Sequence, residues 1–138
     1  MKQPTRGRWM IALFLAGIVP GWGAGAQAAG WPAIALTEVA TGLEAPAGIA
    51  HAGDGSGRVF IVEQRGRIRI WKDGVLEPVP FLNITNRVLY GGERGLLSVA
   101  FPPGFAEKQY FYVNYTRTNG GPSVVARLYV STNDPDVA

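Results

Sequence analysis

The chain has 138 residues and no cysteine, which allows one domain at most and excludes a fold held together by disulfides. Three of its thirteen Lys and Arg residues lie within the first eight positions, and the other ten balance the ten Asp and Glu residues. Beyond its first residues the chain is therefore near neutral. The high pI of the whole chain is therefore no evidence for nucleic-acid binding, and no nucleic-acid partner is expected.

Residues 1–28 have the pattern of a secretory signal peptide. A basic start precedes the eleven apolar residues 9–19 (WMIALFLAGIV), and Ala26-Gln27-Ala28 is typical of a cleavage site. The apolar run is shorter than the roughly 20 residues that span a bilayer, so no stable membrane span is expected after leader removal. A retained anchor is the less favoured alternative. We therefore expect a periplasmic or secreted protein whose mature part is residues 29–138.

The mature part has no sustained helical periodicity. Short apolar or alternating runs recur between Gly, Pro, Asn and Asp residues, which is typical of strands joined by turns. Gly66 and the Asp-Gly pair at 73–74 suit tight turns. The sequence predicts an all-β fold with strands near residues 34–39, 48–52, 58–63, 67–72, 79–84, 96–101, 110–115 and 124–131.

The locally basic segment 65–72 (RGRIRIWK) alternates arginine with apolar residues. Such an alternation has a period of two, which places the arginines on one face of a strand and the isoleucines on the other. The pattern favours a solvated strand face over a phosphate-binding patch.

The chain also contains a faint internal repeat. Ile49 and Val99 lie 50 residues apart in two first strands, and Phe60 and Phe111 lie 51 apart in the strands that follow. A unit of several antiparallel strands over roughly 40 to 50 residues is the size of a β-propeller blade. A β-sandwich with coincidental spacing is the alternative.

The stretch 91–105 (GGERGLLSVAFPPGF) leads from a glycine-rich loop into an apolar strand. In a blade, this loop shares an end of the sheet with the turn after residue 63. We therefore expect Glu93 and Arg94 to lie on the same face as Glu63, Gln64 and Arg65. The glycines precede a strand and not a helix, which argues against a phosphate-binding loop.

Four segments carry a resemblance to a known family: GLEAPAGIA (42–50), GRVFIVEQRGRIRIW (57–71), FLNIT (81–85) and GGERGLLSVAFPPGFAEKQYFYVNYT (91–116). Together they resemble the N-terminal part of the soluble pyrroloquinoline quinone (PQQ)-dependent glucose, aldose and sorbosone dehydrogenases. The similarity covers about residues 38–131, and the pattern GxxGLLxxAFxPxF is its most specific part. It implies that the chain forms the first one and a half to two blades of a six-bladed β-propeller.

The resemblance also implies an activity for the whole protein. Members bind PQQ and Ca²⁺, oxidise the anomeric carbon of a sugar to a lactone, and pass electrons to an exported acceptor. The cofactor does this chemistry while the protein supplies orientation and a base. The family's base histidine, PQQ-binding residues and calcium ligands correspond to positions beyond Ala138. We therefore expect no catalytic residue within this chain, and inactivity of the chain on its own.

Two residues, Glu93 and His51, differ from the functional residues of this family. A glutamine faces the sugar in the family's glucose dehydrogenases, and Glu93 stands at its position here. An ionised carboxylate accepts hydrogen bonds but cannot donate them, so the identity of the sugar is open. His51, the only histidine, matches no catalytic position and is interpreted as a structural or surface residue.

Two alternatives to the enzyme stay open at this point. Similar propellers that carry no cofactor bind a protein or carbohydrate partner outside the cell. A short secreted β-domain, complete at 138 residues, is the other. Because one fold serves many functions, the downstream sequence is the discriminating observation.

Overall fold

The computed structural model describes residues 32–138, and all of its strands belong to one compact unit, Leu36–Ala138. The leader and cleavage site predicted for residues 1–28 lie outside the described residues. Within 32–138, no helix combines the length and apolar character needed to cross a membrane.

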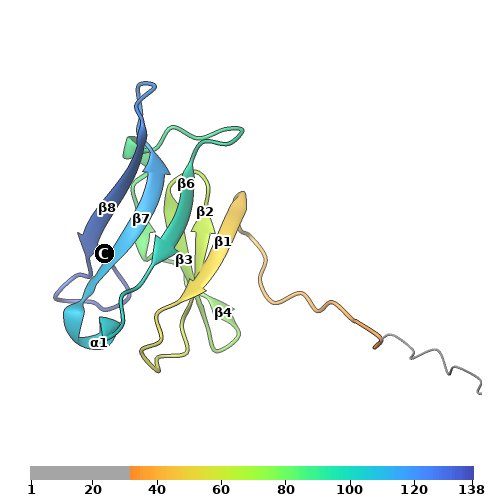
Figure 1. Ribbon diagram of the computed structural model, residues 1–138. Coiled ribbons are helices and arrows are strands. Elements are labelled where there is room, and N and C mark those ends of the chain that lie inside the picture. Colours follow the sequence, from red (N-terminus) through yellow and green to blue (C-terminus); the bar gives the residue numbers. More distant parts are fainter. Residues whose placement is uncertain (1–31) are drawn as a thin grey trace, which may run out of the picture. The chain divides into compact units, whose positions relative to one another are not determined.

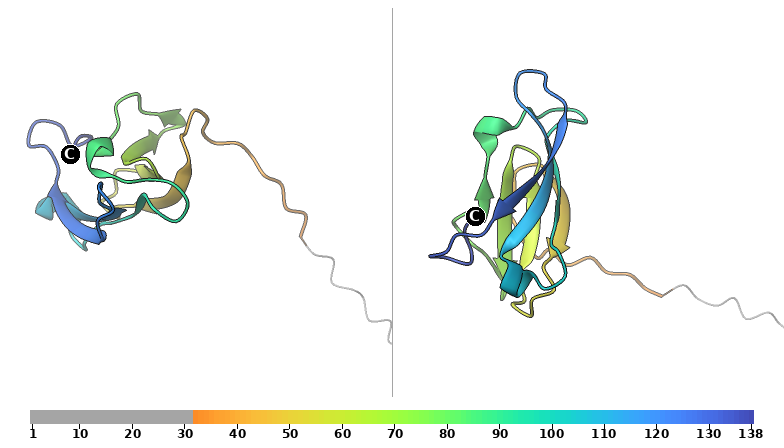
Figure 2. Two further views of the ribbon diagram at one scale, coloured as in Figure 1. Left: turned by 90° about the horizontal axis from the view of Figure 1, so that it is seen from above. Right: turned by 60° about the vertical axis from the view of Figure 1, so that its left-hand side comes forward.

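The unit is built from two antiparallel sheets that lie side by side (Figures 1 and 2). The first has the order β1 (Pro46–His51), β2 (Val59–Glu63), β3 (Arg67–Lys72) and β4 (Val75–Leu76), with β5 (Leu82–Asn83) also paired to β3. The second has the order β6 (Leu96–Ala100), β7 (Tyr110–Thr116) and β8 (Ser123–Tyr129). The 3₁₀ helix η1 (Thr85–Arg87) precedes β6, and the one-turn helix α1 (Phe105–Lys108) precedes β7.

The predicted all-β fold is confirmed, with two corrections to the predicted strands. Residues 34–39 form no strand, and Ile34 and Leu36 are exposed. Their alternation lacks a neighbouring strand to pair with, and pairing is what makes such a pattern a strand. The strand predicted for 79–84 is reduced to Leu82–Asn83, because Pro78 and Pro80 have no N–H to donate to a ladder.

The two sheets repeat the same pattern of strand pairing. Each first strand has an irregularity near its start, between Pro46 and Gly48 in β1 and between Leu96 and Ser98 in β6. Two residues beyond each irregularity, Ala50 pairs with Phe60 and Ala100 pairs with Tyr112. The structural equivalent of Phe60 is therefore Tyr112, one residue further along than the Phe111 inferred from the sequence spacing.

This register decides how the sheets stack. Phe60 is fully buried in the core that the two sheets share, whereas its equivalent Tyr112 lies on the outer face of the second sheet and is 37 % exposed. Phe111, on the opposite face from Tyr112, is the residue that enters the shared core. The face of the first sheet that carries Phe60 therefore packs against the non-equivalent face of the second sheet, as in successive blades of a propeller. In a symmetric sandwich, equivalent faces of the two sheets would pack against each other.

Aromatic side chains from both sheets and from the segment between them fill this core. The Phe81 ring lies 4.9 Å from the rings of both Phe60 and Phe111, and Phe101 lies 4.5 Å from Phe60. Aliphatic residues complete it, and the largest fully buried ones are Ile68, Ile70, Leu96, Val62 and Val113.

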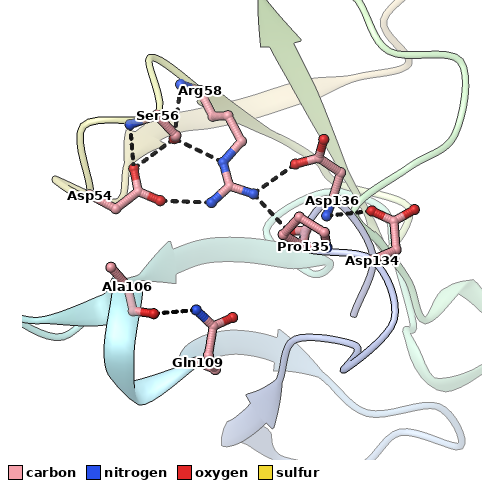
Figure 3. Close-up of polar contacts among 8 residues, drawn as sticks. All are labelled: Asp54, Ser56, Arg58, Ala106, Gln109, Asp134, Pro135 and Asp136. Atoms are coloured by element: carbon pink, nitrogen blue, oxygen red, sulfur yellow. Dashed lines mark hydrogen bonds and ion pairs between the residues drawn. The ribbon is translucent and has the colours of Figure 1, made fainter.

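A buried arginine holds the loop after β1 to the C-terminal segment (Figure 3). Arg58 donates to Asp54 Oδ2 at 2.7 Å, to Asp136 Oδ1 at 2.7 Å and to the carbonyl oxygen of Pro135 at 2.7 Å. Its side chain and that of Asp54 are each 8 % exposed. Burial alone would raise the pKa of Asp54, but hydrogen bonds from Ser56 and Arg58 outweigh it and lower this pKa to about 2.

This pKa predicts an acid-dependent loss of stability. The folded-state pKa of Asp54 lies below its ordinary value of 3.8, so its contribution to stability is complete above about pH 5 and is lost as the pH falls toward about 2. The contribution is at most about 2 kcal/mol. The difference in unfolding free energy between the wild type and Asp54→Asn, measured by urea titration, should therefore shrink between pH 4 and pH 2. A difference that stays constant over this range would contradict the prediction.

Candidate functional site

The 91–95 loop (Gly91–Gly95) lies beside the turn that joins β2 to β3, at the end of the sheets where β6 begins (Figure 1). Gly91 N donates to Arg94 O at 2.9 Å, and Arg94 N donates to Gly91 O at 3.2 Å. Gly92 and Glu93 are the two central residues of this tight turn, and Gly92 has a φ of 57°. A glycine at the first central position is what a type II′ turn requires. The turn therefore presents Glu93 at its tip.

Gln64 connects this loop to the β2–β3 turn. Its side-chain Nε2 donates to the carbonyl oxygens of Gly92, at 2.8 Å, and Arg94, at 3.1 Å. Its backbone carbonyl accepts a 2.8 Å hydrogen bond from Leu96 N. The expected shared face is thus present: the 91–95 loop and the segment 63–65 lie together.

Gly95 allows the two segments to approach this closely. A Cβ at this position would lie 2.6 Å from Gln64 O and 2.4 Å from Gln64 Cγ. The backbone oxygen cannot yield without breaking its bond to Leu96, so any side chain here would push the loop away. Gly95 is fixed by packing as well as by its φ of 156°.

Gly95→Ala is therefore expected to destabilise the protein by about 1–3 kcal/mol, the usual cost of forcing an extra methyl group into a packed site. Urea unfolding followed by fluorescence measures this cost. Gly53→Ala is the matched control, because its φ of 68° is also positive but no atom lies within 4 Å of the added Cβ. Equal losses in the two variants would show that φ alone, and not the contact with Gln64, determines the effect.

Glu93 and Arg94 are both exposed at the turn. Among residues 32–138, neither side chain has a hydrogen-bond or ion-pair partner. The backbone on both sides of Glu93 is held, while its carboxylate is available to an outside ligand.

Glu63 does not share this accessibility. Its carboxyl group is fully buried, accepts a 2.7 Å bond from the backbone N–H of Glu44, and forms a 2.7 Å ion pair with Arg67 Nε. Glu63, which the sequence placed among the candidate residues at this end of the sheets, is therefore a structural residue. Its charge and hydrogen-bonding capacity are used to fasten the chain that enters β1.

Arg65 lies between Glu44 and Tyr90, and hydrogen bonds to both side chains raise its pKa, with the bond to Tyr90 the larger cause. Its guanidinium carbon lies 4.6 Å from the centre of the Tyr90 ring. Glu44 also pairs with Arg67. These side chains, with Thr85 and Val88, line a shallow pocket of about 330 Å³. Of the three arginines predicted to form a solvated strand face, Arg65 and Arg67 pair with carboxylates, whereas Arg69 donates to the backbone carbonyl of Glu77.

The sequence does not indicate that Glu44 and Tyr90 line this pocket. Glu44 lies in an irregular segment before β1, and nothing in its neighbours indicates a partner 21 residues away. Tyr90 directly precedes the Gly-Gly pair, and this adjacency was the only available signal. His51 is exposed at the end of β1. This is the opposite end from Pro46, which pairs with Glu63.

Residues 32–138 contain no group of three or more His, Cys, Asp or Glu side chains placed to hold a metal ion. PQQ is an acidic quinone, and in this part of the chain Arg65 and Arg67 are already paired with Glu44 and Glu63. Arg94 is the cation beside Glu93 that lacks such a partner within 32–138.

Comparison with known proteins places this geometry in a family. The profile of the glucose/sorbosone dehydrogenase family matches residues 43–137. A glucose dehydrogenase-type oxidoreductase from Thermus thermophilus is 35 % identical, with a TM-score of 0.58 over 69 % of this chain and 28 % of that one. The PQQ-bound form of aldose sugar dehydrogenase from Streptomyces coelicolor is 24 % identical and shares the fold, with a TM-score of 0.59 over 72 % of this chain and 29 % of that one.

The human Hedgehog-interacting protein is 43 % identical over 86 residues, which are 59 % of this chain and 12 % of that protein. The chain thus spans under a third of the length of each of these relatives. Its two stacked antiparallel sheets are the beginning of the β-propeller that the sugar dehydrogenases share. The chain belongs to the glucose/sorbosone dehydrogenase family.

Proposed function

We propose that this chain is the N-terminal part of an exported PQQ-dependent sugar dehydrogenase, in which the 91–95 loop contacts the sugar. Glu93 carries the proposal, because its carboxylate is unengaged within residues 32–138 at the tip of a turn that Gln64 holds on both sides. The family profile and the glucose dehydrogenase neighbour support the reaction class. PQQ, calcium and the exported electron acceptor belong to the same proposal and rest on the family.

The role assigned to Glu93 follows from its chemistry. An ionised carboxylate accepts hydrogen bonds from sugar hydroxyl groups and donates none, so it selects hydroxyls that point toward it. Arg94, one residue on, donates hydrogen bonds to oxygen atoms of the same ligand. The loop therefore binds and orients the sugar, while proton removal and oxidation belong to residues and cofactor outside this chain.

The decisive experiment uses the longer gene product that contains this chain. Reduction of a dye in the presence of PQQ, Ca²⁺ and a panel of aldoses should show cofactor-dependent turnover. Glu93→Gln keeps one acceptor oxygen but removes the charge that strengthens the hydrogen bonds of the carboxylate, and it should raise KM for the preferred sugar about tenfold. Glu107→Gln, an exposed carboxylate on α1, is the matched control and should leave KM unchanged.

Two results would count against the proposal in different ways. Absence of PQQ-dependent turnover with every sugar would remove the enzymatic function. Turnover that is equally sensitive, or equally insensitive, to Glu93→Gln and Glu107→Gln would keep the function but remove Glu93 from the sugar site.

A second candidate function is the binding of a protein partner by a cofactor-free propeller. The 43 % identity to the Hedgehog-interacting protein favours it, since the name of that relative states a protein interaction. Spectroscopic titration of the longer protein with PQQ separates the two candidates. Saturable PQQ binding supports the dehydrogenase, and no binding at any calcium concentration supports the protein-binding module.

A further inference from the structure

We infer that Gln64 is a positioning residue that fixes the direction in which Glu93 faces the sugar; this inference rests on the function proposed above. Both hydrogen bonds of its side-chain amide end on the loop, one on the residue before Glu93 and one on the residue after it. A single side chain thus restrains the peptide group that enters Glu93, between Gly92 and Glu93, and the peptide group between Arg94 and Gly95 that leaves the turn.

The amide is itself presented from a fixed point. Gln64 N donates to Ala45 O at 3.0 Å, and Gln64 O accepts from Leu96 N at 2.8 Å. The backbone of Gln64 is therefore bonded to the segment before β1 and to the first residue of β6. Gly95 packs directly against Gln64, which brings the loop within hydrogen-bonding distance of the amide.

The chemistry of the contact requires a glutamine. Two carbonyl acceptors need two N–H donors from one group, which a primary amide supplies. A glutamate has nearly the same shape but, when ionised, repels both carbonyl oxygens. An asparagine is one methylene shorter, and the observed 2.8 Å and 3.1 Å distances leave no slack for that loss. Gln64→Glu therefore removes the restraint while leaving the packing nearly unchanged.

The first arm of the test examines the restraint without relying on activity. In the 138-residue chain, NMR hydrogen exchange reports on the amides of Gly91 and Arg94, whose bonds close the turn. Gln64→Glu should speed their exchange about tenfold at pH 7. Protection should partly return near pH 4, where a protonated Glu donates one hydrogen bond again, and should not return in Gln64→Ala. Gln109→Glu is the matched control, because Gln109 also donates its side-chain amide to a backbone carbonyl, that of Ala106 (Figure 3).

The second arm examines the consequence for the sugar in the longer gene product. Gln64→Glu should raise KM for the preferred sugar about tenfold and change kcat less than twofold, because it disturbs binding and not the reacting groups. The same substitution made on top of Glu93→Gln should add no further rise in KM, since Gln64 acts through Glu93. Gln109→Glu should change neither constant.

The outcomes separate the inference from the function on which it rests. Unchanged exchange in Gln64→Glu overturns the restraint. If Gln64→Glu speeds the exchange of the loop amides but leaves KM unchanged, the positioning role is overturned. The same holds if its effect on KM adds fully to that of Glu93→Gln. A longer protein with no sugar turnover overturns the proposed function, and the positioning of Glu93 toward a sugar with it, while the exchange results still report on the loop itself.

Discussion

Replacing Phe81 with alanine should destabilise the protein by about 3–5 kcal/mol, the usual cost of removing a buried phenylalanine ring. Phe81 is fully buried, and its ring lies 4.9 Å from Phe60 of the first sheet and 4.9 Å from Phe111 of the second. Removing it leaves a cavity where the two sheets meet. Urea unfolding of the full chain, followed by tryptophan fluorescence and circular dichroism, measures the loss.

Val79→Ala is the control for this experiment. Val79 lies two residues earlier in the same connecting segment but is 59 % exposed, so its truncation should cost under about 0.5 kcal/mol. Comparable losses in both variants would mean that the segment as a whole, and not the Phe81 ring, joins the sheets.

Arg58→Ala should destabilise the protein by about 3 kcal/mol, the lower part of the range for breaking a buried ion pair. The substitution leaves the Asp54 carboxylate, which is 8 % exposed, without its cation. Asp136 loses less, because its side chain is 44 % exposed and water replaces the guanidinium. The same urea titration at pH 7 measures the effect.

Two further measurements make this prediction specific. Arg87→Ala removes an exposed arginine from η1 and should change the unfolding free energy by under about 0.5 kcal/mol. In an Asp54→Asn background, Arg58→Ala should cost clearly less than in the wild type, because the charge left behind is gone. Equal costs in both backgrounds would mean that Asp54 is not the partner that makes Arg58 important.

Much of the local structure could be predicted from residue patterns alone. The alternation of arginine and isoleucine in 67–72 identified β3 to the residue, because a period of two with one apolar face has no stable alternative. The glycines at 66 and 74 marked turns that have positive φ. The GxxGLLxxAFxPxF pattern carried the family assignment, which the profile match to residues 43–137 confirms.

The candidate site was predicted only in part. Blade topology predicted that Glu93 and Arg94 lie at the same end of the sheets as Gln64, and in the structure Gln64 is hydrogen-bonded to their loop. That the Gln64 side chain donates to the loop, whereas the Glu63 side chain is buried against Glu44 and Arg67, did not follow from the sequence. Successive residues at the end of a strand point to opposite faces, so the face that becomes buried depends on what packs there.

The sequence by itself determined the all-β class, the strand-forming alternations and the family, because each is encoded by residues close together in the chain. Only the tertiary structure decided that non-equivalent faces of the two sheets pack against each other, with Phe81 between the two sheets. It also decided that Arg65 pairs with Glu44 and Tyr90. These features depend on strand register and on contacts between distant residues. A shift of one residue, from Phe111 to Tyr112, reverses which face is buried, and spacing alone cannot detect such a shift.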